Sequence, residues 1–149
     1  DHHMKTKRLD FLNRDVSGVI MGTMPLFSGD LAEHFEHLDM ATELGVNILD
    51  TAIGYGGAEL SIGKWMTARG NRQQNVIITK GCHPGPNGKR VTPKDLAEDL
   101  YRSLDRLETD YIDIYLLHRD DLDLPVAKDG RSRIGRSEID ADNCHGIPP

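Results

Sequence analysis

The stretch that decides the fold is GVNILDTAIGYGGAEL, residues 45–60. Within it an apolar run, residues 46–49, ends in Asp50, and Tyr55 follows five positions later among glycines. A short apolar run bounded by turn residues is typical of a buried strand. The stretch therefore predicts a strand whose end carries an acid and a phenol.

Other apolar runs predict further strands on both sides of this stretch. One is expected at residues 19–21, ending at Gly22, and the β-branched run at 76–79 fits a strand that is buried on both faces. Residues 111–117 predict another strand, and a small hairpin is expected within residues 5–16. The chain thus places four short strands at intervals after the hairpin.

Helices are expected between these strands. Asp30 stands at an N-cap position with Glu33 three residues later, which predicts a capping box, and apolar residues recur at helical spacing until Gly45. The other two helices are expected over residues 58–68, closed by Gly70, and from Pro93 to Leu107, opened by Thr92 as the N-cap.

The alternation of strands and helices predicts an α/β fold on a parallel sheet with right-handed crossovers. Lys80 follows Asp50 by 30 residues and His118 follows Lys80 by 38, so each interval is about one strand–helix–strand repeat. This period fits either a closed (β/α) barrel or an open doubly wound sheet. The turn after residues 46–49 lacks the Gly-x-Gly-x-x-Gly pattern of a dinucleotide-binding open sheet, which favours the barrel.

The composition limits the classes of function. A chain of 149 residues is long enough for one domain. Its net charge of −6 argues against a surface for nucleic acid or anionic membranes, so the expected partner is a small molecule. No apolar run reaches the ~20 residues of a membrane span and no signal peptide is evident, which predicts the cytoplasm. Residues 1–3 resemble the remainder of an affinity tag, and no disulfide between Cys82 and Cys144 is expected.

Four polar residues stand at or just beyond the expected strand ends: Asp50, Tyr55, Lys80 and His118. In a parallel sheet such ends lie on one face, so the fold is expected to gather these side chains. A carbonyl that is reduced by hydride needs a proton, which a phenol can donate if a nearby ammonium favours the phenolate left behind. Asp50 would hold the ammonium of Lys80, and His118 would orient the substrate oxygen. The set predicts proton delivery to a carbonyl.

The motifs LDTAIGYGGAELSIGKWM, VIITKG and DYIDIYLLHRDD, with GTM after the first expected strand, resemble the aldo-keto reductase family. The resemblance covers residues 4–126 and implies an NAD(P)H-dependent reductase of aldehydes and ketones on a TIM-type (β/α)8 barrel. It implies a catalytic tetrad in which Tyr55 is the general acid, together with Asp50, Lys80 and His118.

The resemblance also implies how the cofactor is held. It favours NADP(H) over NAD(H), although the residues themselves do not decide between the two. The family binds the nicotinamide carboxamide with a Ser-Asn pair after the fifth strand, whereas this chain has Ser137 followed by Glu138. The implied nicotinamide contacts are Gly22, Thr23, Met24, Asp50 and Ser137.

The family pattern changes after residue 126. Ser137 lies only 19 residues after His118, too close for a whole unit with its helical crossover of ~10–12 residues. Residues 127–149 are therefore expected to hold a shortened fifth strand and helix, so that the chain forms about the first four to five units of the barrel. Three interpretations of the chain stay open: it is an active reductase, a non-catalytic remnant or binding module, or part of a longer polypeptide. Exposed sheet edges would favour homo-oligomers.

Two other groups of residues have simpler interpretations. His34, His37 and His83 are metal ligands by type, but zinc needs three or four convergent ligands and no fourth is found, so a solvated helix face is expected for the first two and no metal site. Cys82 would be reactive if Lys80 lowered its pKa, whereas a free loop thiol is the simpler expectation.

Overall fold

The computed structural model describes residues 4–119. The tag-like residues 1–3, the expected fifth strand and helix, Ser137 and Cys144 lie outside this part. The strands are β1 (Thr6–Leu9), β2 (Arg14–Ser17), β3 (Met21–Gly22), β4 (Ile48–Asp50), β5 (Val76–Gly81) and β6 (Ile114–Leu117). The helices are α1 (Leu31–Glu43), α2 (Ala58–Arg69) and α3 (Pro93–Arg106), with short 3-10 turns η1 (Asp10–Leu12), η2 (Met24–Leu26) and η3 (Arg72–Gln74).

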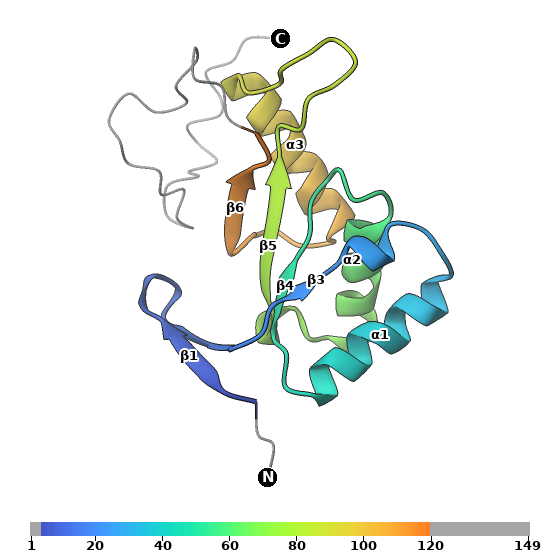
Figure 1. The fold of residues 1–149 in the computed structure, drawn as a ribbon, viewed down its shortest axis with the longest axis vertical. Helices are drawn as coiled ribbons and strands as arrows, with labels where there is room; N and C mark the ends of the chain where they lie inside the picture. Colours follow the sequence, from blue (N-terminus) through green and yellow to red (C-terminus); the bar gives the residue numbers. More distant parts are fainter. Residues whose placement is uncertain (1–3, 120–149) are drawn as a thin grey trace.

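Strands β3 to β6 form a parallel sheet in chain order, β3-β4-β5-β6, with a helix in each of the three crossovers. The three helices cover one face of this sheet, and the hairpin β1–β2 lies toward the other face (Figure 1). Parallel strands with helices in every crossover are the repeating unit of the TIM barrel. The α/β barrel prediction is confirmed as a partial barrel of this type.

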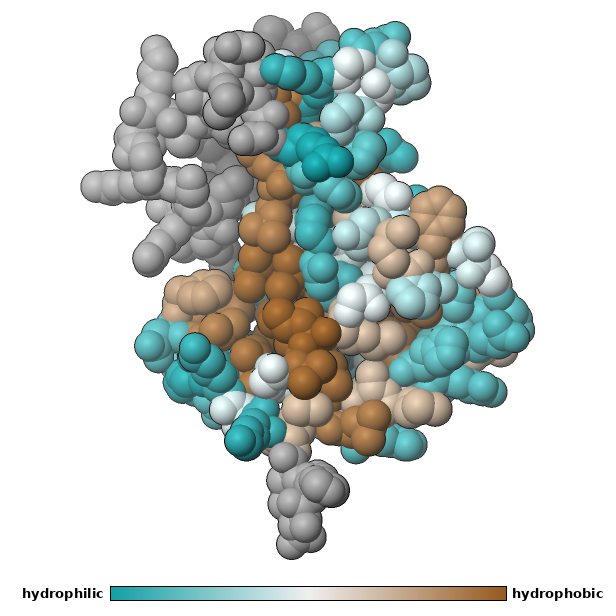
Figure 2. Space-filling model, viewed as in Figure 1, coloured by the Kyte–Doolittle hydropathy of each residue, from teal (hydrophilic) through white to brown (hydrophobic). Residues whose placement is uncertain are grey.

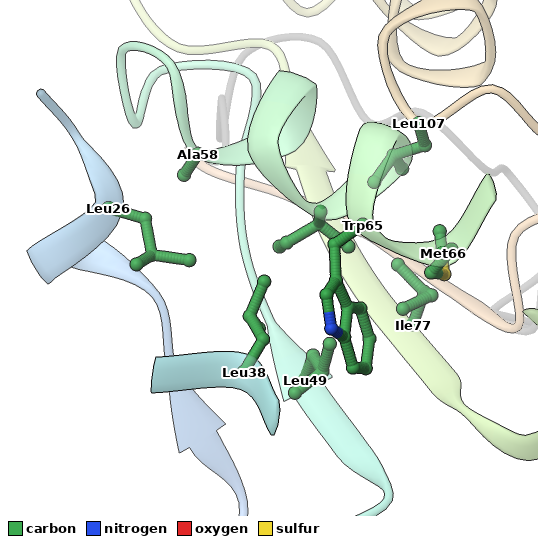
Figure 3. Packing of buried hydrophobic residues seen from close by; sticks show 9 residues of the cluster. Leu26, Leu38, Leu49, Ala58, Trp65, Met66, Ile77 and Leu107 are labelled. Atoms are coloured by element: carbon green, nitrogen blue, oxygen red, sulfur yellow. The ribbon is translucent and has the colours of Figure 1, made fainter. Parts of the chain in front are cut away.

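The main hydrophobic core lies between the sheet and the helices. Leu49 of β4 and Ile77 of β5 point to this side, and Trp65 of α2 lies between them with its ring buried (Figure 3). Side chains alternate between faces along a strand, so the residues next to Leu49 and Ile77 must point the other way. The other buried members are Leu26, Leu38, Ala58, Ile62, Met66 and Leu107.

A second, smaller core lies on the opposite face. Ile48, Val76 and Ile78 point there and pack with Val16 of the hairpin. Apolar side chains form a band along the strands in the space-filling view (Figure 2). Asp50 and Lys80 follow Ile48 and Ile78 at two-residue spacing, so the same alternation places both polar side chains on this face, beyond its apolar floor.

The helix caps predicted from the sequence are confirmed for α3 and α2 but not for α1. Thr92 and Asp95 exchange hydrogen bonds between side chain and backbone, a complete capping box. Gly70 ends α2 in the left-handed conformation, with φ of 62°. The capping box expected at Asp30 is wrong, because the Asp30 carboxylate accepts no hydrogen bond from the helix although its backbone has the extended N-cap conformation.

Strands β3 and β6 begin later than predicted, and specific hydrogen bonds account for both. The Ser17 hydroxyl donates a hydrogen bond of 2.6 Å to the carbonyl of Val19, which bends the chain so that only Met21–Gly22 enters the sheet. The guanidinium of Arg72 donates to the carbonyl of Tyr111 and to the Asp113 carboxylate, both at 2.9 Å, and β6 begins only at Ile114. None of the helices within residues 4–119 is long and apolar enough to cross a membrane.

Candidate active site

An ion pair between Asp50 and Lys80 lies at the floor of the site. Asp50 pairs with Ile78 in the sheet register, so Lys80 lies two residues further along β5 and its side chain reaches back. The ammonium contacts Asp50 Oδ1 at 2.5 Å and the Thr51 carbonyl at 2.9 Å. The Lys80 side chain is only 16% exposed, and charge-assisted bonds of this kind hold a partly buried ammonium in one place.

Tyr55 lies in the loop between β4 and α2, above this ion pair. Lys80 Nζ is 5.1 Å from the centroid of the Tyr55 ring, and the ring of His118 meets the Tyr55 ring edge to face at 5.9 Å between centroids. The structure therefore brings together the four residues that the sequence placed at strand ends, Asp50, Tyr55, Lys80 and His118.

His118 directly follows β6 and is tied to the sheet by its backbone, whose N–H donates to the carbonyl of Gly81 at 2.8 Å. Its Nδ1 is buried and has no hydrogen-bond partner within residues 4–119. Burial lowers the pKa of His118, and the neighbouring His83, Lys80 and Arg119 lower it further, against the opposing effect of Asp50. The surroundings of His118 thus favour its neutral form.

The loop that carries Tyr55, residues 51–57 between β4 and α2, is called the tyrosine loop, and its glycines fix its conformation. Gly56 has φ of 53°, and a Cβ at this position would lie 2.4 Å from the Phe27 carbonyl oxygen. Gly57 donates its N–H to the same oxygen at 2.8 Å. Only a residue without a side chain fits at Gly56, so the loop that presents Tyr55 rests directly on the turn after β3.

A buried ionic network connects this loop to strand β5, and sequence reasoning missed it. Glu59 is fully buried, accepts a hydrogen bond of 2.6 Å from the Thr79 hydroxyl, and pairs with Arg106 Nε at 3.0 Å. Arg106 also donates to the carbonyl of Gly56. The network therefore holds the residue after Tyr55 and the residue before Lys80. The sequence did contain a signal for this network: Glu59 is a charged residue on the apolar stripe of α2, three residues before Ile62.

The turn after β3 forms one wall beside Asp50. Thr23 is fully buried and donates through both its N–H and its hydroxyl to the Asp50 carbonyl, at 3.0 and 2.9 Å. A Cβ on Gly22 would meet nothing within 4 Å, and Met24 is 53% exposed. This open backbone next to Asp50 is the kind of surface on which a flat ring can lie, so the residues present fit a nicotinamide.

Of two expectations outside this group, one is wrong and one is confirmed. His34 does not face solvent; it is buried, with Nδ1 2.8 Å from the Ser61 hydroxyl and Nε2 3.2 Å from the Ser28 carbonyl. Cys82 is a free thiol in the loop after β5, as expected; it is buried, and burial, followed by the charges of Asp99 and Asp95, raises its pKa to about 11. Within residues 4–119 no group of three or more His, Cys, Asp or Glu side chains could hold a metal ion.

Residues 18–141 match the model described as "Aldo/keto reductase family". The chain belongs to the aldo/keto reductase family. Among curated members of this family, the chain is similar to Protein tas of Escherichia coli, with 32% identity over 133 residues, 77% of this chain and 38% of the relative.

Solved aldo-keto reductases share the fold of this chain. The holo form of AKR11C1 from Bacillus halodurans has 35% identity and a TM-score of 0.71, and the match covers 83% of this chain and 43% of that chain. The aldo-keto reductase from Klebsiella pneumoniae, solved in complex with NADPH, has 28% identity and a TM-score of 0.63, over 80% of this chain and 41% of that chain. The chain spans about two fifths of the length of these family members.

Proposed function

We propose that this chain carries the proton-delivery half of an NADPH-dependent carbonyl reductase, with Tyr55 as the general acid. The observation that supports this most directly is the grouping of a phenol, an ion-paired ammonium and a neutral imidazole at one end of the sheet. Family membership and the NADPH complex of the Klebsiella pneumoniae relative support the oxidoreductase class and the cofactor.

In this proposal each residue has one task. His118 donates a hydrogen bond from Nε2 to the substrate carbonyl and orients it, because Nδ1 is buried and not accessible to a ligand. Tyr55 gives its proton to the oxygen as negative charge develops there. The ammonium of Lys80 stabilises the phenolate that remains, and Asp50 keeps that ammonium in position.

The cofactor would be held at the turn after β3. When bound, NADPH supplies the hydride that reduces the carbonyl carbon. Gly22 offers an open backbone surface, Met24 an exposed side chain, and Thr23 keeps the turn against β4 through its bonds to Asp50. Ser137 is also proposed as a nicotinamide contact by resemblance to the family, and the cytoplasmic location stays a prediction.

The test is the loss of NADPH oxidation when the proposed acid is removed. Tyr55→Phe should lower kcat/KM for an aromatic aldehyde by about 100-fold or more, because positioned proton transfer contributes about 10²–10⁴. The absorbance of NADPH is the measurement. Tyr101→Phe is the matched control, since Tyr101 lies on α3 on the other face of the sheet and its loss should leave turnover unchanged. Equal rates for Tyr55→Phe and the parent chain would refute the assignment.

Cofactor binding separates the reductase from a non-catalytic remnant. NADPH should bind saturably to both the parent chain and Tyr55→Phe, because the phenol acts on the substrate oxygen. The emission of NADPH itself is the suitable signal, since Trp65, the single tryptophan, is buried in the core on the helical face. A folded chain that does not bind NADPH would support the remnant instead.

A further inference from the structure

His83 brings a second imidazole to the candidate active site, next to His118. His83 lies in the loop after β5, three residues beyond Lys80, and its ring meets the ring of His118 edge to face with centroids 4.8 Å apart. That is closer than the 5.9 Å between the rings of His118 and Tyr55. His118 is therefore flanked by two rings, the Tyr55 phenol and the His83 imidazole.

The backbone is shaped for this contact. A Cβ on Gly54, in the tyrosine loop, would lie 3.9 Å from His83 Cδ2 and 4.0 Å from His118 Cε1, so the Gly54 backbone is close to both imidazoles. His83, His118 and Gly54 therefore form one packed group. Movement of any one of them changes the space that the other two occupy.

The hydrogen bond of His83 fixes its tautomer and its ring orientation. Its Nδ1 lies 3.0 Å from the Pro84 carbonyl, which can only accept, so Nδ1 carries a hydrogen and Nε2 is the unprotonated nitrogen of the neutral ring. His83 is exposed, so its ring covers His118 from the solvent side. His118 differs, because protonation of its buried Nδ1 would create an N–H without an acceptor among residues 4–119.

Charged groups from several elements surround His118. They are Asp50 from β4, Lys80 from β5 and the adjacent Arg119, and the phenol of Tyr55 lies beside them in the tyrosine loop. Among the neighbours that lower the pKa of His118, His83 is the one whose ring packs against the His118 ring.

We propose that His83 is a positioning residue of the active site: its ring holds His118 against Tyr55. The proposal rests on the function proposed above, in which His118 orients the carbonyl. Packed between two rings, the His118 imidazole has little room to turn, so its Nε2 keeps one direction toward the substrate oxygen.

Imidazole NMR tests the proposal without any turnover. The chain is 15N-labelled on histidine, and the His118 signals are assigned with His118→Asn. In His83→Ala the His118 titration midpoint should move to higher pH, because His83 is one of the groups that lower the pKa of His118. His83→Phe keeps a ring at the contact, so the His118 Cε1–H signal should move less than in His83→Ala. His37→Phe, on the exposed face of α1, is the control and should change neither.

The rate of reduction tests the consequence. At pH 8, His83→Ala should have a lower kcat than the parent chain, since the ring contact is lost, and His83→Phe should recover much of it because a ring is kept at the contact. An unchanged His118 Cε1–H signal in both variants would overturn the proposal. If no variant turns over NADPH but this signal moves, the proposed function fails and the packing of the two imidazoles stands.

Discussion

Arg106 Nε contacts the fully buried carboxylate of Glu59 at 3.0 Å, across the packing of α3 on α2. Removing one partner of a buried ion pair leaves the other charge without compensation, which costs about 3–5 kcal/mol. We therefore expect Arg106→Leu to lower the free energy of unfolding by about 3 kcal/mol, since the guanidinium is 21% exposed. Urea denaturation measures this change.

Two further variants make that prediction specific. Glu59→Leu combined with Arg106→Leu should be more stable than Arg106→Leu alone, because no unpaired charge is left. Arg8→Met removes an exposed ion pair to Asp15 and should cost less than about 1 kcal/mol. If Arg106→Leu were no more harmful than Arg8→Met, the buried pair would have no part in stability.

Asp50→Asn should lower kcat more than it changes KM. The substitution keeps the size of the side chain but removes the charge that holds the Lys80 ammonium at 2.5 Å. Misplacement of a group that acts in proton transfer costs about 10–100-fold in rate, so we expect a fall of this size in kcat. Asp39→Asn is the matched control, because Asp39 is also ion-paired, to Arg69, but lies on α1. Equal kcat losses in the two variants would indicate a general loss of folding.

Gly56→Ala should destabilise the chain and impair the tyrosine loop. The new Cβ would approach the Phe27 carbonyl to 2.4 Å, and φ of 53° is unfavourable for any L side chain. We expect a loss of about 2 kcal/mol in the free energy of unfolding. Gly70→Ala shares the positive φ of 62° but meets nothing within 4 Å, so its loss should be nearer 1 kcal/mol. Thermal unfolding of the two variants separates steric clash from backbone strain.

Cys82 should resist thiol reagents in the folded chain. Its pKa of about 11 leaves about one thiolate in a thousand at pH 8, and the side chain is buried. In a Cys144→Ser background, a disulfide reagent should react slowly at pH 8, faster as the pH approaches 11, and quickly in urea. Rapid reaction at pH 8 without denaturant would show that the thiol is accessible.

The association expected from the sequence can be measured in solution. Within residues 4–119, β3 and β6 each have a single neighbour in the sheet, and Leu116 of β6 is 44% exposed. Strand edges and apolar faces of this kind favour pairing with another chain. Sedimentation over a range of concentrations should show a dimer, weakened by Leu116→Lys. A monomer at every concentration would exclude this form of association.

Local patterns gave the order of elements and the four grouped polar residues, because strand ends in a parallel sheet share one face wherever the loops go. The late start of β3 follows a local bond from the Ser17 hydroxyl to Val19, which the apolar pattern does not indicate. The start of β6 depended on a bond from Arg72 to Tyr111, 39 residues away, which no short window of sequence contains. The same holds for Glu59 and Arg106, which lie 47 residues apart. His34 was misassigned because its partner Ser61 lies on a different helix.

Strand β5 turns neighbouring residues to opposite sides, with Thr79 bonded to Glu59 beneath the helices and Lys80 bonded to Asp50 in the site. The number of residues in β5 is therefore as tightly constrained as the identities of Thr79 and Lys80. One residue inserted or deleted before Thr79 would exchange the two faces, placing an ammonium among the helices and a hydroxyl opposite the aspartate. Insertions and deletions that preserve function should fall in the loops, and strand β5, Val76–Gly81, should keep its length.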